Sequence, residues 1–288
     1  MKTLLLDVGG TFIKCSDGRE IPIRSDGSRE EISSSFAEAV GAFCNEDSCV
    51  NDAETASGNR QRDCEIAVAI PGPFDYERGI FLMKHKFSAV YGMSFREVAG
   101  VPSCVRLLFT HDVNVMLAGE MFYGNGRGYS RVALVALGTG LGFAMSIDGR
   151  ILKKATGSPL VSIFGLPYRD GILEDYASKR GFLGTFKALG GQGAATVKDI
   201  AEFAGGGDKA ALETFRSIGS TIARTISPIL KEYGIECLLF GGQISRSFRF
   251  LEPALREGLS GVESLVEISQ VSNFDNATFN GLRAMLRQ

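Results

Sequence analysis

Residues 1–14, with the sequence MKTLLLDVGGTFIK, decide how the rest of this chain is interpreted. Leu4–Leu6 form an apolar run without a helical period, which predicts a short buried strand. Asp7 follows this run, residues 9–11 (Gly-Gly-Thr) turn the chain, and Phe12 and Ile13 begin a second strand. The stretch therefore predicts a hairpin with a carboxylate and two glycines near its turn.

The turn of this hairpin has two interpretations. Asp7 at a strand end suits Mg²⁺ held through water, because Mg²⁺ keeps most of its waters and takes few carboxylates. Gly9 and Gly10 lack Cβ, so the backbone N–H groups there, together with Thr11, can close on a phosphate. An ordinary hairpin turn is the alternative, since Gly-Gly is common in such turns. The choice depends on the rest of the chain.

Length and composition set broad limits. The 288 residues are enough for two lobes with a sizeable core. The contents of 44% hydrophobic and 22% charged residues are typical of a globular enzyme. A formal net charge of −2 leaves no electrostatic footprint for nucleic acid, so no nucleic-acid partner is expected.

Cysteine and histidine usage argues against a structural zinc site. The chain has six Cys and two His, and no two Cys are spaced as C-x-x-C, whereas closed zinc sites take four such ligands at short spacings. After Lys2 the apolar run is too short for a signal peptide, and no apolar run approaches the roughly 18 residues of a membrane span. We expect a reduced, cytoplasmic protein without a membrane segment.

Apolar patterns predict a series of strands and helices along the chain. Strands are expected at residues 21–23, 65–70, 106–110, 131–136, 143–147, 236–240 and 265–268. Helices are expected at residues 31–44, 115–122, 173–182, 209–233, 248–259 and 277–286, with a loop at 45–63. Pro228 lies inside the longest helix, and we expect it to bend or break that helix.

A second glycine turn repeats the pattern of the first. The strand at 131–136 leads into Gly138, Thr139 and Gly140, and an apolar strand resumes at 143–147. A repeat about 130 residues apart suggests two related lobes. We expect a small N-terminal lobe at 1–113, to which the last helix returns, and a larger C-terminal lobe at 114–288.

Three glycine turns at strand ends suit a nucleotide. The first two can embrace phosphates through backbone N–H groups and threonine hydroxyls, and the third, Gly241 and Gly242, can support an adenosine near a helix N-terminus. The sequence lacks G-x-x-x-x-G-K-[ST], which excludes a P-loop. No G-x-G-x-x-G follows the first strand, which argues against a dinucleotide fold.

Asp112 is the candidate base. It lies directly after one predicted strand and before a predicted helix, where a carboxylate can reach into a cleft. Phosphoryl transfer to an alcohol needs a group that takes or orients the hydroxyl proton, plus charge stabilisation on the phosphates. A helix cap is the alternative role for an Asp at this position.

The motifs in this order resemble those of one known family, the ROK family of sugar kinases within the actin-like ATPase superfamily. The matching stretches are DVGGTFIK (7–14), AIPGPFD (69–75), HDVNVMLAGE (111–120), LGTGLG (137–142), FGGQIS (240–245) and DNATFNGL (275–282). Each motif is weak alone, but together they span nearly the whole chain.

The resemblance implies an α/β, two-lobed actin-like ATPase (ribonuclease H-like) fold with a central cleft. It implies ATP-dependent transfer to a hydroxyl of a sugar or sugar derivative, with Asp112 as base and Mg²⁺ held by Asp7 through water. The implied cofactor-binding residues are Asp7, Gly9, Gly10, Thr11, Lys14, Gly138, Thr139, Gly140, Gly241 and Gly242. The implied sugar-binding residues are Gly72, His111 and Glu174. Relatives in the family are often homodimers.

The sequence departs from the family in the sugar half of the site. The family carries a His and three Cys that bind zinc, but residues 157–174 contain neither His nor Cys, so the zinc site is expected to be absent. In a loose alignment, Ser158 and Ala155 stand where a His and a Glu help to bind the sugar. His111 replaces the Asn before the base, and Lys86 stands at a second sugar-facing Asn.

These departures leave several interpretations open. A changed acceptor is one, and the added positive charge of Lys86, His85 and His111 suits an acidic or already phosphorylated sugar. Equally, Lys86 can be a solvated surface lysine and His111 a packed residue. A catalytically weak homologue that acts as a sugar- or nucleotide-binding regulator is the second function. DNA-binding relatives begin with a helix-turn-helix, whereas this sequence begins at the hairpin, so DNA binding is not expected.

Overall fold

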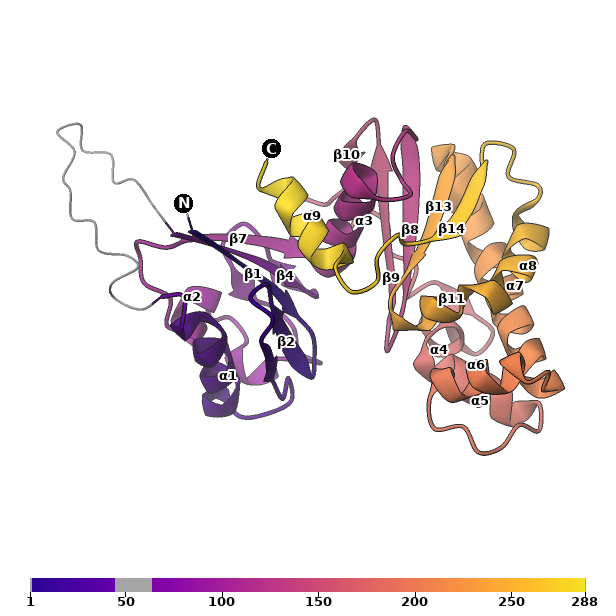
Figure 1. The fold of residues 1–288 in the computed structure, drawn as a ribbon, viewed down its shortest axis with the longest axis horizontal. Coiled ribbons are helices and arrows are strands. Elements are labelled where there is room, and N and C mark those ends of the chain that lie inside the picture. Colours follow the sequence, from indigo (N-terminus) through magenta and orange to yellow (C-terminus); the bar gives the residue numbers. More distant parts are fainter. Residues whose placement is uncertain (1, 45–63, 288) are drawn as a thin grey trace. The chain divides into compact units, whose positions relative to one another are not determined.

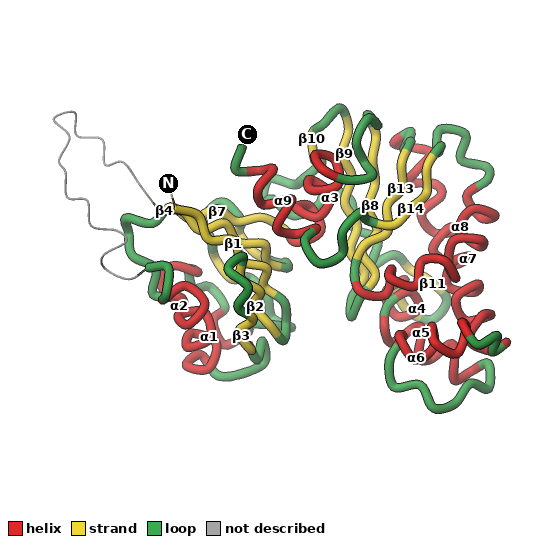
Figure 2. Tube along the Cα trace, viewed as in Figure 1, coloured by secondary structure: helices red, strands yellow, loops and turns green. Residues whose placement is uncertain are grey.

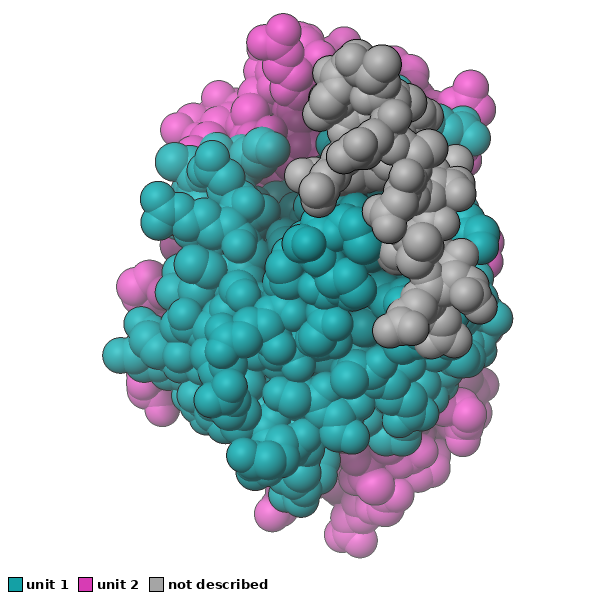
Figure 3. All heavy atoms as spheres, turned by 90° about the vertical axis from the view of Figure 1, so that its left-hand side faces the viewer, with its two compact units in different colours: residues 1–115, 153–158, 282–288 teal, residues 116–152, 159–281 magenta. Residues whose placement is uncertain are grey.

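The computed structural model describes residues 2–44 and 64–287 and divides them into two compact units. Unit 1 comprises residues 1–115, 153–158 and 282–288, and unit 2 comprises 116–152 and 159–281; Figure 3 colours them separately. The loop expected at 45–63 lies outside the described residues.

Unit 1 is built on a mixed five-stranded sheet with the order β3-β2-β1-β4-β7 (Figure 1). The strands are β1 (Lys2–Val8), β2 (Phe12–Cys15), β3 (Glu20–Pro22), β4 (Cys64–Ile70) and β7 (Arg106–His111). The first three pair antiparallel, and β1, β4 and β7 run parallel. Every residue of β4 is buried, as expected for the middle of a parallel set.

Helices and aromatic rings complete the core of unit 1. Helix α1 (Arg29–Gly41) begins with a capping box in which Ser28 and Glu31 exchange hydrogen bonds. Phe36 on α1 is fully buried and contacts Phe81, Phe87 and Phe95 at ring-centroid distances of 5.8, 5.9 and 5.0 Å. The smaller elements here are β5 (Phe74–Asp75), β6 (Ile80–Phe81), the 3₁₀ turn η2 (Ser88–Val90) and α2 (Phe95–Ala99).

Unit 2 repeats this sheet topology with the order β10-β9-β8-β13-β14. Its strands are β8 (Arg131–Leu137), β9 (Leu141–Ile147), β10 (Arg150–Ile151), β13 (Cys237–Gly241) and β14 (Glu267–Gln270). Again the first three in sequence pair antiparallel, and β8, β13 and β14 run parallel. The predicted internal repeat is therefore visible in the strand connections of the two sheets.

Helices pack beside this second sheet (Figure 2). They are α4 (Leu173–Ala177), α5 (Lys179–Ala188), α6 (Val197–Gly205), α7 (Lys209–Tyr233) and α8 (Phe248–Leu259), with a short hairpin of β11 (Pro167–Tyr168) and β12 (Gly171–Ile172) and the 3₁₀ turn η3 (Gln243–Ser247). The predicted apolar stripe of α7, which includes Phe215, Ile218 and Ile222, is buried in the core.

Of the two effects predicted for Pro228, a bend or a break in the longest helix, the break is wrong. Helix α7 is 25 residues long and continues through Pro228. It is capped at its C-terminal end by Gly234, which adopts a left-handed conformation (φ +61°). Pro228 lies on the exposed face, as does Arg224 one turn earlier, whose carbonyl loses its helical partner. Water can satisfy that carbonyl, so the helix tolerates the proline.

One predicted helix, residues 173–182, is two helices. Ser178 is extended (φ −122°, ψ −178°) between α4 and α5, and the N–H of Lys179 donates to the carbonyl of Gly138 at 2.9 Å. This contact fixes the start of α5 on the second glycine turn. Helices α2 and α6 are additional to the prediction, although Thr196 and Asp199 form a capping box at the start of α6.

Helices α3 (Asp112–Tyr123) and α9 (Ala277–Met285) each contain residues of both units. Within unit 2 they pack closely, because a Cβ on Gly119 would lie 2.7 Å from the Ala277 carbonyl oxygen and 2.9 Å from the Gly281 nitrogen. Helix α3 begins at Asp112, three residues earlier than predicted. No helix among the described residues is long and apolar enough to cross a membrane.

Candidate functional site

The predicted site residues divide between the two units, and each group is described by itself. Unit 1 holds Asp7, Gly9, Gly10, Thr11, Lys14, Gly72, His111 and Asp112, and unit 2 holds Gly138, Thr139, Gly140, Glu174, Gly241 and Gly242.

The first glycine turn joins β1 to β2. Gly9 donates its N–H to the carbonyl of Phe12 at 2.9 Å, so this amide closes the turn. In the described part of the chain, the N–H groups of Gly10 and Thr11 have no acceptor. These two amides, on a turn without Cβ at Gly9 or Gly10, fit a phosphate oxygen. Gly9 shapes the turn and leaves Gly10 and Thr11 as the donors.

Asp7 and Lys14 lie opposite each other in the β1–β2 ladder. The Lys14 ammonium lies 3.6 Å from a carboxylate oxygen of Glu20 on β3, and its side chain is 43% exposed. The Lys14 charge is therefore paired with the Glu20 carboxylate on the neighbouring strand. A single carboxylate such as Asp7 fits Mg²⁺ that keeps its waters.

Asp112 lies where β7 ends and α3 begins. One carboxylate oxygen accepts the N–H of Val113 at 2.7 Å and lies 2.8 Å from Nδ1 of His111. The side chain is still 43% exposed, so it can meet a ligand. A cap would accept an N–H two or three residues on, whereas Asp112 accepts that of the next residue. Its place at the positive end of α3 favours the charged form.

The proton on His111 can be assigned from these contacts. A carboxylate only accepts hydrogen bonds, so the 2.8 Å contact places a proton on Nδ1 of His111. Nδ1 also lies 3.3 Å from the N–H of Val113, but that N–H has the closer acceptor in Asp112. In the neutral tautomer Nε2 is then an acceptor. His111 thus orients the Asp112 carboxylate.

The pKa of Asp112 reflects opposing causes. Burial by itself raises the pKa, but the charge of His111 and its hydrogen bond, the Val113 N–H and the charge of Lys86 together hold the pKa below its ordinary value. Asp112 is therefore a carboxylate at neutral pH. Such a weak base suits phosphoryl transfer, where the hydroxyl needs orientation more than early deprotonation.

The Pro-Gly loop after β4 packs against His111. A Cβ on Gly72 would lie 3.2 Å from the Tyr76 hydroxyl and 3.5 Å from Cδ2 of His111. The Tyr76 hydroxyl donates to the carbonyl of Ile70 at 3.0 Å, and its ring lies 5.8 Å from the His111 ring. Unit 1 thus brings together Gly72, His111 and Asp112, three residues expected to face a substrate.

Asn114 is absent from the residues predicted for the site. It is buried, its Nδ2 donates to the carbonyl of Gly157 at 3.1 Å, and its Oδ1 has no hydrogen-bond partner among the described residues. Segment 153–158, which carries Ala155 and Ser158, belongs to unit 1 and is held there by this bond and by the N–H of Tyr76. The spacing D-x-N directly after β7 is the sequence feature that could have identified Asn114 as a site residue.

The second glycine turn, between β8 and β9, is held from two sides. Gly138 donates its N–H to the carbonyl of Gly140 at 3.0 Å, and its own carbonyl accepts from Lys179. Thr139 and Gly140 are exposed, and their N–H groups have no acceptor among the described residues. This turn also fits a phosphate.

Glu174 acts on this turn from α4. One carboxylate oxygen accepts the N–H of Leu141 at 3.0 Å, and the other lies 3.2 Å from the Arg180 guanidinium. A Cβ on Gly140 would lie 2.9 Å from the first oxygen. Glu174 is only 24% exposed. The residue predicted to bind sugar is therefore bonded to the glycine turn.

Close packing explains why positions 241 and 242, the third glycine pair, are both glycine. A Cβ on Gly241 would lie 2.4 Å from the Met116 sulfur, and one on Gly242 would lie 2.3 Å from the Leu137 carbonyl oxygen. Gly242 also has φ +80°, a conformation that side chains disfavour. These glycines let β13 end against β8, whether or not a nucleotide also binds there.

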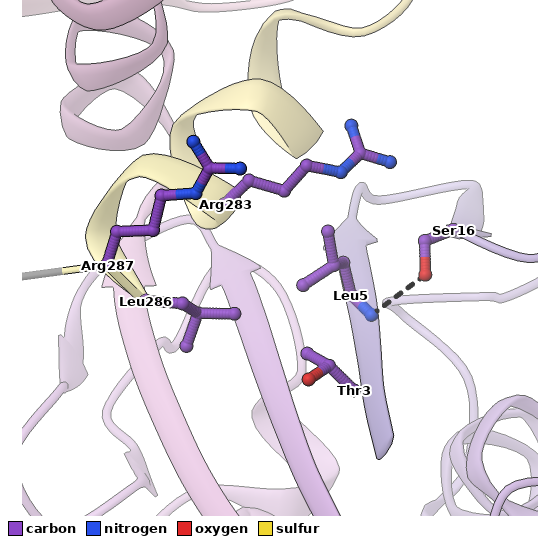
Figure 4. Close-up of a pocket in the computed structure, with 6 residues that line it drawn as sticks. All are labelled: Thr3, Leu5, Ser16, Arg283, Leu286 and Arg287. Atoms are coloured by element: carbon purple, nitrogen blue, oxygen red, sulfur yellow. Dashed lines mark hydrogen bonds between the residues drawn. The ribbon is translucent and has the colours of Figure 1, made fainter. Parts of the chain in front are cut away.

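Among the described residues, no group of three or more His, Cys, Asp or Glu is placed to hold a metal ion. The absence of a zinc site stays a prediction. An open hollow of about 320 Å³ in unit 1, lined by residues on β1, by Ser16 and by α9 with the turn after it, contains none of the predicted site residues (Figure 4). Its lining residues are Thr3, Leu5, Ser16, Arg283, Leu286 and Arg287.

Comparison with known proteins decides the family. The ROK family model matches residues 6–159 and 167–280. The chain belongs to the ROK family. A glucokinase from Thermotoga maritima is 25% identical over 214 residues, which are 67% of this chain and 68% of the relative. The DNA-binding transcriptional repressor Mlc of Escherichia coli is 24% identical over 244 residues, 78% of this chain and 59% of the repressor.

A solved structure extends the comparison to the fold. The ROK family glucokinase from Streptomyces griseus, in complex with glucose and AMPPNP, has a TM-score of 0.74 over 99% of this chain and 98% of the relative, at 19% identity. The chain therefore has the α/β actin-like ATPase fold of the ROK sugar kinases. This confirms the predicted fold class and the resemblance.

Proposed function

We propose that this ROK protein is a sugar kinase that transfers the terminal phosphoryl group of ATP to a hydroxyl of a sugar or sugar derivative. The observation that carries the proposal is the Asp112 carboxylate, oriented by His111 at 2.8 Å and exposed beside the Gly72 loop. The glucokinases from Thermotoga maritima and Streptomyces griseus support an enzyme of this class.

Each residue has a role in this proposal. Asp112 accepts a hydrogen bond from the acceptor hydroxyl and takes its proton as the new bond to phosphorus forms. The N–H groups of Gly10 and Thr11 bind phosphate oxygens, as do those of Thr139 and Gly140. ATP with Mg²⁺, near Asp7, supplies the phosphoryl group when bound. Lys14 lies on β2, and Gly241 and Gly242 lie at the end of β13. These residues support nucleotide binding by holding their strands in place.

The proposed acceptor is a sugar whose contacts depart from the family pattern. Gly72 and His111 would contact it, and Glu174 would act through the second glycine turn. His111, Lys86, Ala155 and Ser158 all differ from the family pattern, so the acceptor is expected to differ from that of a typical glucokinase.

A coupled assay of ADP release against a panel of neutral, acidic and phosphorylated sugars tests the function. Asp112→Asn should lower kcat by about 10²-fold or more, the range for losing a general base. Full turnover by this variant on the best sugar would refute the assignment of the base. ADP release that does not depend on sugar would indicate an ATPase.

The Mlc relative leaves one alternative, a catalytically weak homologue that acts as a sugar- or nucleotide-binding regulator. That function predicts thermal stabilisation by a sugar or nucleotide without ADP release from any sugar. Light scattering on the same samples tests the homodimer that the family suggests.

A further inference from the structure

Lys86 lies against the first glycine turn, although 76 positions separate the two in sequence. A Cβ built on Gly10 would lie 3.6 Å from Cε and 3.7 Å from Nζ of Lys86. The side chain is partly buried. The ammonium therefore lies beside Gly10, and the N–H groups of Gly10 and Thr11 lack an acceptor among the described residues.

The backbone holds Lys86 in this place. The N–H of Phe87 donates to the carbonyl of Ser25 at 2.5 Å, and the N–H of Ser25 donates to the carbonyl of Gly10 at 3.3 Å. Phe87 has φ +53°, which a residue with a Cβ adopts at a cost. Its ring is fully buried against Phe36 and Phe81, at 5.9 and 5.7 Å. A buried anchor thus fixes the strained turn that presents Lys86.

The charge of Lys86 acts on the predicted base, and the ammonium lacks a close acidic partner. Lys86 is near enough to Asp112 for its charge to lower the pKa of that carboxyl. Within residues 2–44 and 64–287 no carboxylate lies within ion-pair distance of its ammonium. A solvated surface lysine would not be packed against a glycine turn in this way.

We propose that Lys86 is a catalytic residue, whose ammonium binds the phosphoryl group during its transfer to the hydroxyl at Asp112. The proposal rests on the proposed function. The oxygen–phosphorus bond to the acceptor forms, the bond to ADP breaks, and the hydroxyl proton goes to Asp112. Lys86 keeps its proton throughout. A lysine serves as a point charge for phosphate, and it stabilises oxygens that gain charge in the transition state.

The test compares Lys86→Gln and Lys86→Arg with a matched control, Lys84→Gln. Lys84 is exposed, with its ammonium 5.5 Å from the Tyr91 ring centroid. Lys86→Gln should lower kcat about 10- to 100-fold with the sugar KM within about threefold, as expected for a lost charge on a transferring phosphoryl group. Lys86→Arg should restore part of kcat, and Lys84→Gln should leave it unchanged.

Binding without turnover gives a second measurement. We expect the ratio of affinities for AMPPNP over ADP, both with Mg²⁺, to fall about fivefold or more in Lys86→Gln, because only AMPPNP carries the third phosphate. A kcat within twofold of wild type together with an unchanged ratio would overturn the proposal. A rise in KM confined to acidic or phosphorylated sugars would also overturn it, since Lys86 would then recognise the acceptor. If the wild-type protein turns over no sugar, the proposed function fails, and the affinity ratio alone decides the role of Lys86.

Discussion

Replacement of Glu174 by Ala separates two roles for this residue, sugar binding and support of the second glycine turn. In the structure one carboxylate oxygen accepts the Leu141 N–H at 3.0 Å, beside Gly140. Ala removes this acceptor and leaves the N–H to water. We therefore expect the turn between β8 and β9 to loosen, with weaker nucleotide binding.

The structure sets the size of the effect. A hydrogen bond to a charged group contributes about 1.5–3 kcal/mol, and the 24% exposure of Glu174 lets water replace part of it. The loss should be about 1–2 kcal/mol, which corresponds to roughly 5- to 30-fold in affinity. Glu174→Gln keeps an acceptor for the Leu141 N–H and loses only the ion pair with Arg180. Because Arg180 is exposed, this ion pair contributes about 0–1 kcal/mol.

Two measurements check this prediction. Hydrogen exchange of the peptide containing Leu141 should be faster in Glu174→Ala by about the same factor and near wild type in Glu174→Gln. The KM for ATP should rise in Glu174→Ala while the KM for the sugar changes less. A rise in the sugar KM alone, with unchanged exchange at Leu141, would refute the reasoning and return Glu174 to a direct contact with sugar.

Three further predictions concern the buried and titrating groups. Glu120 is 2% exposed, and its carboxylate accepts the N–H and the hydroxyl of Ser272 and the N–H of Asn125. Glu120→Ala should therefore lower the free energy of unfolding, measured in urea, by about 3 kcal/mol or more. Glu120→Gln should lower it by about 1 kcal/mol. Burial raises the pKa of Cys237 to about 12 whereas Cys104 is exposed, so mass mapping should find Cys104 alkylated in the native protein and Cys237 only after unfolding. Because the folded pKa of Asp112 lies below 3.8, its carboxylate stays charged at higher pH, and the stability from its contacts is lost only as pH falls through that folded value. The pH profile of kcat should therefore show no loss from Asp112 at any pH above the ordinary pKa of an aspartate, and a midpoint well above that pKa that vanishes in Asp112→Asn would contradict this.

Local patterns predicted most of the elements. The stripe of α7 and the glycine pairs at strand ends are encoded within a few residues, so periodicity and turn chemistry locate them. Helix α8 was predicted with the bounds it has in the structure. One error arose where a distant contact decided the outcome. The 173–182 segment breaks at Ser178 because Lys179 bonds to Gly138, 41 residues earlier.

The sequence by itself determined the order of the glycine turns, the place of Asp112 between a strand and a helix, and the departures at His111 and Lys86. Tertiary structure alone decided what these residues touch. In the folded protein His111 contacts the Asp112 carboxylate, Glu174 accepts the N–H of Leu141, and Lys86 lies against Gly10. The physical reason is that backbone preference is local, whereas a polar side chain takes its partner from whichever segment the packed core places beside it.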